Sequence, residues 1–193
     1  MPVYPGDRQP RIIQTAYFNS DGYSSFELSL NSHCGTHIDG PMHMLRGQRI
    51  LSDYPVECFC GSGCLIDMHG RKTLDYSKDL DNTVPEGSIA LIRTGWDSRF
   101  GSNSYFNGYP VMTIRLAQYL ADRKVKIIGL DSPSPDQPPY DTHKLLMQNG
   151  IFIIENLSGL DRLTNAGAFE IFALPLKVAA DSAPARVIAR LPE

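Results

Sequence analysis

The sequence lacks any long apolar run, and this absence argues against a membrane-spanning helix. An apolar segment such as residues 151–154 falls far short of the roughly 20 residues that a bilayer requires. The N-terminus also lacks an apolar stretch behind a basic segment, which is the pattern of a secretory signal peptide. The cytoplasm is therefore the expected location.

Basic character is scarce as well. The net charge is −3, and no run of lysine and arginine marks a nucleic-acid tail. These features argue against DNA, RNA or an anionic membrane as a partner. The expected partner is a small-molecule substrate.

Paired cysteines are also missing. The four cysteines lie at positions 34, 58, 60 and 64, without the CxxC spacing of a zinc knuckle. A chain of 193 residues with no export signal does not need disulfide bonds for stability. No internal repeat or linker divides the chain, so residues 1–193 are expected to form a single domain.

Short apolar runs indicate a protein rich in strands. One strand is indicated where Phe26, Leu28 and Leu30 alternate with polar residues, which is the pattern of a half-buried strand. The other five are buried strands at residues 64–68, 88–93, 125–130, 151–155 and 169–178. Strands outnumber helices, so we expect an α/β domain built on a mixed sheet.

Two helices are predicted. Thr113 is suited to cap a helix that runs to about Lys124, with apolar residues along one face. Either Asp141 or Thr142 caps a shorter helix that ends at Gly150. The proline-rich segment before the second helix, residues 132–139, is a surface loop that leads into His143.

Three of the five histidines lie within eleven residues, in the segment His33-Cys34-Gly35-Thr36-His37-Ile38-Asp39-Gly40-Pro41-Met42-His43. Glycine and proline disfavour a helix here, so the first part of the segment is read as a strand. Alternate side chains of a strand share a face, which brings together His33, His37 and Asp39. Residues four apart are roughly 13 Å apart in a straight strand, and a kink at Gly35 would shorten that distance.

Imidazole nitrogens with a carboxylate oxygen form a ligand set that suits Zn²⁺ first, with Mn²⁺ or Fe²⁺ as alternatives. Three protein ligands leave a position open for water, whose pKa a metal ion lowers towards about 7. The alternative is that these histidines are hydrogen-bonded structural groups. Their clustering with Asp39 favours a metal site, whereas the isolated His69 is expected to be structural.

A second pair of ligand-type residues follows later in the chain. His143 lies on the shorter helix, and Glu155 ends an apolar strand. A charged residue at such a strand end can simply mark its exit into solvent. Together the two residues could instead supply ligands for a second ion.

The eleven-residue segment resembles the HxGTHxDxPxH motif of the cyclase family, which includes bacterial kynurenine formamidases (arylformamidases). The resemblance implies a mixed α/β domain with a β-barrel-like core and flanking helices, assembled as a homodimer or homotetramer. Further matches extend over nearly the whole chain, at Tyr4-Pro5-Gly6-Asp7, Arg93-Thr94-Gly95-Trp96, Gly129-Leu130-Asp131, His143 with Glu155-Asn156-Leu157, and Ala173-Leu174-Pro175-Leu176.

The resemblance also implies a ligand set for two zinc ions. His33, His37 and Asp39 match the ligands of the first ion. Asp39 would bridge to a second ion held by His143 and Glu155.

Other positions carry implied roles in catalysis and substrate binding. His43 matches the residue that donates and accepts protons, and Tyr4 occupies the place of a substrate-binding tryptophan. Thr36 stands where kynurenine formamidases commonly have alanine. The family usually has a further strand before the segment that contains Tyr4, so a sheet edge here could need a partner.

These observations predict a metal-dependent hydrolase that cleaves an amide bond in a small molecule. N-formylkynurenine, which would give kynurenine and formate, is the first substrate to test. One alternative is hydrolysis of another cyclic amide or ester, and a second is a metal-binding protein without turnover. Metal coordination alone does not require His43, so the presence of this residue favours an enzyme. Trp96, Tyr105 and Phe106 could line an aromatic pocket or simply pack in the fold.

Overall fold

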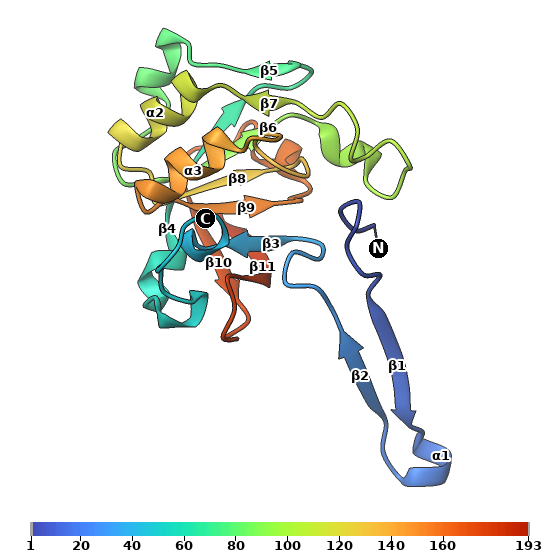
Figure 1. Ribbon diagram of the computed structural model, residues 1–193. Helices are drawn as coiled ribbons and strands as arrows, with labels where there is room; N and C mark the ends of the chain where they lie inside the picture. The colour runs from blue at the N-terminus through green and yellow to red at the C-terminus, as the bar shows by residue number, and fades with distance from the viewer. Residues whose placement is uncertain (1, 193) are drawn as a thin grey trace.

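The centre of the fold is a closed β-barrel of seven strands, seen in a computed structural model that describes residues 2–192 (Figure 1). Strands β4, β6, β8 and β9 run parallel, and the pairs β9–β3, β3–β11, β11–β10 and β10–β4 are antiparallel. The barrel strands are β3 (His37–Asp39), β4 (Cys60–Asp67), β6 (Ile89–Arg93), β8 (Ile127–Leu130), β9 (Phe152–Glu155), β10 (Phe169–Pro175) and β11 (Ser182–Arg190). The expected mixed α/β domain with a barrel core is confirmed.

Alternation along the strands gives the barrel two apolar faces. Ile38, Leu91 and Ile154 are fully buried or nearly so and belong to a cluster enclosed by the barrel. Their neighbours on the other face of the wall, such as Ile92 and Ile153, pack with residues of the two long helices. Each such side chain contributes roughly 1.5–3 kcal/mol by leaving water.

Helices α2 (Ile114–Asp122) and α3 (Asp141–Gln148) lie together on one side of the barrel, beside β8 and β9 (Figure 1). The predicted cap of α2 is confirmed, because the Thr113 side chain accepts a hydrogen bond from the Leu116 N–H. The predicted cap of α3 is wrong, because Tyr140 occupies that position and makes no side-chain cap. The carboxylate of Asp136 instead accepts hydrogen bonds from the backbone N–H groups of Thr142 and His143 in the first turn of α3.

Short elements fill the connections around the barrel. Strands β5 (Thr73–Leu74) and β7 (Val111–Met112) form a separate parallel pair. The 3₁₀ turns are η1 (Pro41–His43), η2 (Leu51–Asp53), η3 (Val56–Phe59), η4 (Lys78–Asn82), η5 (Trp96–Arg99) and η6 (Leu160–Leu163). Among residues 2–192, no helix has the length and apolar character needed to cross a membrane.

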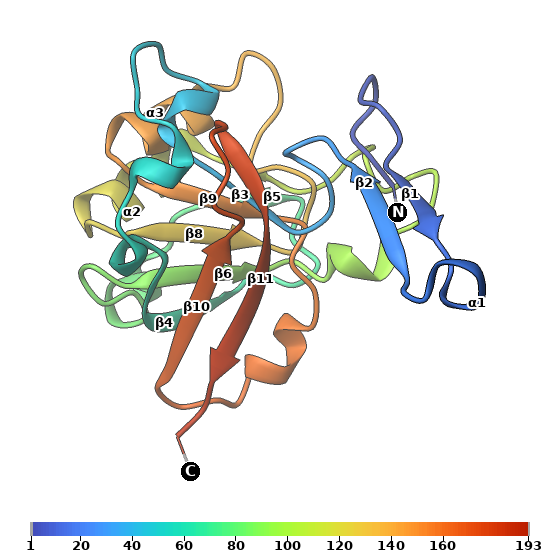
Figure 2. The ribbon, with the colours of Figure 1, turned by 90° about the horizontal axis from the view of Figure 1, so that it is seen from below.

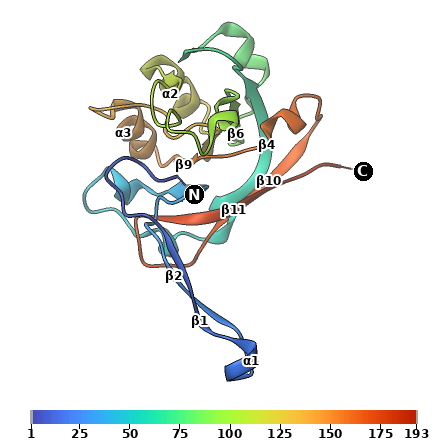
Figure 3. The same ribbon diagram turned by 90° about the vertical axis from the view of Figure 1, so that its right-hand side faces the viewer.

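A hairpin of β1 (Arg11–Ala16) and β2 (Ser25–Ser29), with α1 (Phe18–Asp21) at its tip, extends away from the barrel in all three views (Figures 1, 2 and 3). We call residues 11–29 the arm. A strand at residues 25–29 is thus confirmed, but the expected half-burial is wrong, because Phe26 and Leu28 are exposed on the arm.

Two differences from the predicted elements have clear physical causes. The predicted strand over the histidine segment is only partly right, because β3 contains His37–Asp39 alone. Turns precede it, with Gly35 in the left-handed region at φ 69°, so the expected kink is present. Strand β11 was not predicted, because Pro184 and Arg186 interrupt its apolar pattern.

Candidate functional site

Strand pairing brings the first ligand candidates together on the outer face of the barrel wall. His37 lies directly opposite Glu155 in the β3–β9 register. Asp39 is two residues further along β3 and therefore shares the face of His37. The intervening Ile38 points into the barrel core. His37 and Asp39 are each only 1% exposed.

The first predicted ligand set is compact. Asp39 Oδ1 lies 2.9 Å from His33 Nδ1 and 3.4 Å from His37 Nε2. One potential metal-ligand atom from each of the three residues (an imidazole nitrogen or a carboxylate oxygen) lies within 4.8 Å of the other two. Ligand atoms of a tetrahedral zinc ion are roughly 3.3 Å apart, since each is about 2.0–2.1 Å from the metal. The spacing is therefore appropriate for one ion.

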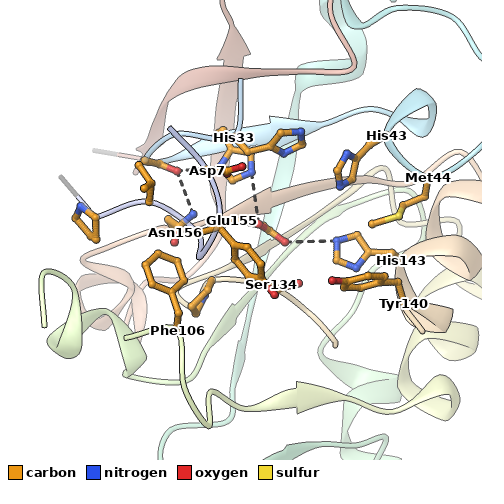
Figure 4. Close-up of a pocket in the computed structure, with 16 residues that line it drawn as sticks. Asp7, His33, His43, Met44, Phe106, Ser134, Tyr140, His143, Glu155 and Asn156 are labelled. Atoms are coloured by element: carbon orange, nitrogen blue, oxygen red, sulfur yellow. Dashed lines mark hydrogen bonds and ion pairs between the residues drawn. The ribbon is translucent and has the colours of Figure 1, made fainter. Parts of the chain in front are cut away.

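Glu155 connects this set to His143 on α3. Its Oε1 lies 3.4 Å from His143 Nε2, and its Oε2 lies 3.4 Å from His37 Nε2 (Figure 4). Donor atoms of Asp39, His43 and His143 also lie within 4.8 Å of one another. The structure thus brings all five predicted ligands into one cluster, and places His43 close enough to be considered a ligand as well.

In two of these histidines, the ring nitrogen that faces away from the cluster contacts a neighbouring oxygen. His37 Nδ1 lies 2.8 Å from the carbonyl oxygen of Gly35, and His143 Nδ1 lies 2.5 Å from Asp136 Oδ1. Such partners fix the orientation and tautomer of a ligand histidine. Sequence reasoning missed Asp136, which lies in the proline-rich loop that it assigned to the surface.

The cluster contains buried polar atoms that need a partner. His37 Nε2 and both carboxylate oxygens of Asp39 are buried and make no hydrogen bond within residues 2–192. The close approach of His33 to Asp39 is thus an ion-pair distance without hydrogen-bond geometry. An unsatisfied buried polar group costs about 1–3 kcal/mol, and more when charged. A divalent cation bound here would satisfy all three atoms, so the residues fit a metal ion.

His33 and His143 bind protons more tightly than an ordinary histidine does. Burial lowers the pKa of His33, but the carboxylates of Asp181 and Asp39 outweigh burial and raise it to about 10. Burial likewise opposes the effect of Asp136 and of Glu155 on His143, whose pKa also rises to about 10. At neutral pH these rings are therefore protonated when no metal is bound, and a metal ion has to displace those protons.

The pKa values of the two carboxylates in the cluster shift in the opposite direction, downwards. Burial raises the pKa of Asp39, but the neighbouring His37 and His33 outweigh burial and hold it below its ordinary range. The pKa of Glu155 is also lowered, because His143 and His37 overcome the effect of burial. Both carboxylates are therefore ionised, which is the form that binds a metal.

A cavity of about 290 Å³ opens beside the cluster (Figure 4). Its walls include Tyr4, Phe106 and Tyr140, and the Tyr4 and Phe106 rings meet edge to face at 5.7 Å. Tyr4, the position for which the family resemblance implies substrate binding, therefore lines this cavity. The other residues that line the cavity are Pro2, Val3, Asp7, His33, Gly35, His37, His43, Met44, Pro133, Ser134, His143, Glu155 and Asn156.

Trp96, Tyr105 and Phe106 were expected either to line a pocket or to pack in the fold, and two of the three have structural roles. Tyr105 is fully buried, and its hydroxyl donates to Asn156 Oδ1 at 2.8 Å. The Trp96 indole N–H donates to the carbonyl oxygen of Tyr105 at 2.8 Å. Phe106 lines the cavity as expected. Sequence reasoning missed Tyr140, which follows the proline-rich loop.

The remaining singled-out residues are also located. His43 ends η1, with its Nδ1 3.0 Å from the carboxylate of Asp181. The Thr36 hydroxyl donates to the backbone carbonyl oxygen of Asn156 at 2.6 Å, which is a structural contact. His69 packs against Gly95, where a Cβ atom would come within 2.4 Å of its ring, and it does not line the cavity.

Comparisons with known proteins agree with this fold. The Cyclase family model, described as "Putative cyclase", matches residues 1–137. The kynurenine formamidase of Bacillus mycoides (strain KBAB4) is 31% identical over 97% of this chain and 90% of its own length.

Two solved structures share the whole architecture. A "predicted metal-dependent hydrolase" from Bacillus stearothermophilus is 27% identical, with a TM-score of 0.78 over 98% of this chain and 91% of that one. Isatin hydrolase A from Labrenzia aggregata has a TM-score of 0.85 at 24% identity, covering 100% of this chain and 88% of that one. At 24% identity, the similarity to isatin hydrolase A shows a shared fold and no more.

Proposed function

Since the chain belongs to the cyclase family, we propose that it is a metal-dependent hydrolase that cleaves an amide bond in a small molecule. The observation that carries this proposal is the buried pair His37 and Asp39, whose unpaired polar atoms lie beside a cavity of about 290 Å³. That volume is near the lower end for small-molecule sites, which are typically about 300–1,000 Å³.

N-formylkynurenine is the substrate that we propose first. It has an aromatic ring and an N-formyl group, and relatives at about 31% identity are named kynurenine formamidase. Tyr4, Phe106 and Tyr140 offer aromatic surfaces against which such a ring can pack. They would hold the ring while excluding water from that side of the cavity.

The ligand assignment follows the two halves of the cluster. His33, His37 and Asp39 would hold one ion, and His143 with Glu155 would hold a second, with Asp39 shared. Zn²⁺ suits this donor set best, with Mn²⁺ as an alternative. A bound divalent ion would supply an activated water molecule and polarise the carbonyl oxygen of the substrate.

We propose that His43 carries the proton that the reaction has to move. Hydrolysis forms a bond from the water oxygen to the formyl carbon, and it breaks the bond from that carbon to the aniline nitrogen. The departing nitrogen needs a proton, which the attacking water releases. His43 lines the cavity and is partly exposed, so its ring can accept the proton from water and donate it to nitrogen.

The direct test is an assay of kynurenine formation from N-formylkynurenine, together with a panel of other formamides and cyclic amides. We expect hydrolysis to cease after treatment with a chelator and to return with Zn²⁺ or Mn²⁺. The His69→Ala variant serves as a control, because His69 lies outside the cavity. Preference for a cyclic amide would redirect the substrate assignment. Metal binding with no hydrolysis of any compound would contradict the proposal.

The ligand assignment predicts more than one metal ion per chain. Elemental analysis after reconstitution should approach two ions per chain for the parent protein. Glu155→Gln should lower this number towards one, because an amide is a weaker ligand than a carboxylate and Glu155 serves the second site. A parent protein that stays at one ion under saturating Zn²⁺ would count against that site.

We also propose that the protein is a homo-oligomer. The exposed face of the arm carries apolar side chains, since Ile12 pairs with Leu28 and the two are 60% and 62% exposed. A two-stranded hairpin with an uncovered apolar face is marginally stable in water. Burying that face against a second copy would shield the apolar side chains from water and stabilise the hairpin.

This proposal predicts that charges on the apolar face of the arm disrupt assembly. The double variant Ile12→Glu with Leu28→Glu should shift the molar mass in light scattering from a multiple of 21.4 kDa to 21.4 kDa. Glu27→Gln, a change at a residue that pairs with Ile13 on the other face, should leave the mass unchanged. A parent protein that is monomeric at micromolar concentration would refute the assembly.

A further inference from the structure

A single carboxylate oxygen contacts two histidines of the cluster. Oδ2 of Asp181 lies 3.0 Å from His33 Nε2 and 3.0 Å from His43 Nδ1. The two rings are adjacent, with centroids 4.3 Å apart (Figure 4). The other oxygen, Oδ1, accepts a weaker contact from the Ser32 hydroxyl at 3.4 Å. Neither the family motif nor the ligand assignment above includes Asp181.

Backbone pairing fixes Asp181 relative to the histidine segment. The next residue, Ser182, begins β11 and lies opposite Asp39 in the β3–β11 register. The Gly40 N–H donates to the carbonyl oxygen of Asp181 at 2.9 Å. A Cβ atom at Gly40 would lie 3.1 Å from that oxygen, so the close approach of the two segments favours glycine. The carboxylate is therefore held in place by the barrel wall.

The chemistry of the two contacts determines where each ring carries its proton. An ionised carboxylate only accepts hydrogen bonds, and a neutral imidazole has one N–H and one lone pair. An aspartate carboxylate is ordinarily ionised at neutral pH, and both contacts are at hydrogen-bond distance. The nitrogen that faces Asp181 must then be the N–H in each ring.

The consequences differ for the two histidines. With a metal ion bound, His33 would be neutral and protonated at Nε2, which leaves the lone pair of Nδ1, on the side of Asp39 at 2.9 Å, available as a ligand. His43 would be protonated at Nδ1, which leaves the lone pair on Nε2. This is the tautomer in which Nε2 can accept a proton, whereas free imidazole side chains favour the opposite tautomer, with the proton on Nε2.

We propose that Asp181 is a positioning residue that sets the tautomers of both His33 and His43. Through the first ring it orients a metal ligand, and through the second it prepares a proton acceptor. The catalytic part of this inference rests on the function proposed above, whereas the tautomer assignment does not. Asp181 also lies within 4.8 Å of donor atoms of both histidines, so direct metal binding by Asp181 is the competing interpretation.

Two substitutions separate these interpretations. Asp181→Ala removes the acceptor, and Asp181→Asn keeps a carbonyl oxygen that accepts a hydrogen bond from an N–H. The tautomer of His43 is read from long-range ¹⁵N–¹H correlation spectra of the zinc-loaded protein, at a pH where the ring is neutral. We expect an Nδ1–H signal in the parent and in Asp181→Asn, and an Nε2–H signal in Asp181→Ala.

Metal affinity and activity provide a second readout. Losing a partner that orients a ligand typically costs about 10–100-fold in metal affinity or activity. We expect Asp181→Ala to show a loss of that size, Asp181→Asn a smaller loss, and Asp161→Ala, an exposed control, none. In a His43→Ala background, Asp181→Ala should lower kcat by less than it does in the parent, because part of its effect acts through that ring.

Three outcomes would overturn the proposal. An unchanged His43 tautomer in Asp181→Ala would show that the carboxylate does not set it. Loss of one metal equivalent in both variants would identify Asp181 as a ligand. Equal losses with and without His43 would show that Asp181 does not act through that ring. The spectra and metal affinities need no substrate, so an inactive parent would contradict the proposed function and leave the tautomer test standing.

Discussion

Replacing His37 with alanine is expected to remove metal from the site and to abolish most hydrolysis. Nε2 of His37 lies 3.4 Å from Asp39 Oδ1 and 3.4 Å from Glu155 Oε2, so it contacts both halves of the cluster. Its loss leaves two protein ligands for the first ion, too few for the coordination that zinc prefers. The ion contributes several kcal/mol to the rate, so we expect kcat/KM to fall by roughly 10³-fold or more.

Metal content and kcat/KM measured on one preparation provide the test. The His37 ring is buried, and its Nδ1 lies against the carbonyl oxygen of Gly35, so the substitution also affects packing. The melting temperature of metal-free protein separates this effect from the loss of the ion. His69→Ala is the matched control, as a histidine remote from the cavity. A His37→Ala protein with full metal content and full activity would invalidate the ligand assignment.

Replacing His43 with alanine should lower kcat while the metal stays bound. General acid–base catalysis is typically worth about 10²–10⁴-fold in rate. That range corresponds to roughly 3–5 kcal/mol at about 1.4 kcal/mol per tenfold change. His43 follows the extended β3 in a 3₁₀ turn, so it approaches the cluster from a different direction than His37 and Asp39.

The measurement has to separate this role from two others, because the structure also places His43 within ligand distance of Asp39 and His143. A ligand would reveal itself by loss of metal. A packing residue would reveal itself by a lower melting temperature, with kcat of the folded fraction intact. Met42→Ala, at the exposed neighbour in the same turn, controls for changes in the turn itself. Parent kcat in His43→Ala would end the proton-carrier interpretation.

Local patterns were enough to predict most of the barrel. Each apolar run that was read as a strand is a strand. In the parallel strands β6, β8 and β9 the run is continuous because both faces are buried. Helix α2 was predicted with its cap because Thr113 and the apolar stripe are local signals. The two-residue strands β5 and β7 and the irregular β11 have no such pattern, since tertiary pairing determines them.

The candidate site likewise contains residues that local sequence patterns predict and residues that they do not. His33, His37 and Asp39 were found because they lie close together in sequence, and the structure brings them together. Asp181 and Asp136 were missed because isolated carboxylates in loops carry no local signal. Asp181 reaches His33 across 148 positions of the sequence, through the pairing of β3 with β11. Contacts of this kind follow from the closed barrel and cannot be inferred from spacing.

The location of a metal ion tests the central claim most directly. Crystals grown with Zn²⁺ and measured at the zinc absorption edge would give an anomalous difference map. The account predicts a strong peak about 2.0–2.2 Å from His37 Nε2 and from a carboxylate oxygen of Asp39, which are typical zinc–ligand distances. A map without a peak at these atoms, from protein that hydrolyses its substrate in the presence of zinc, would contradict the account.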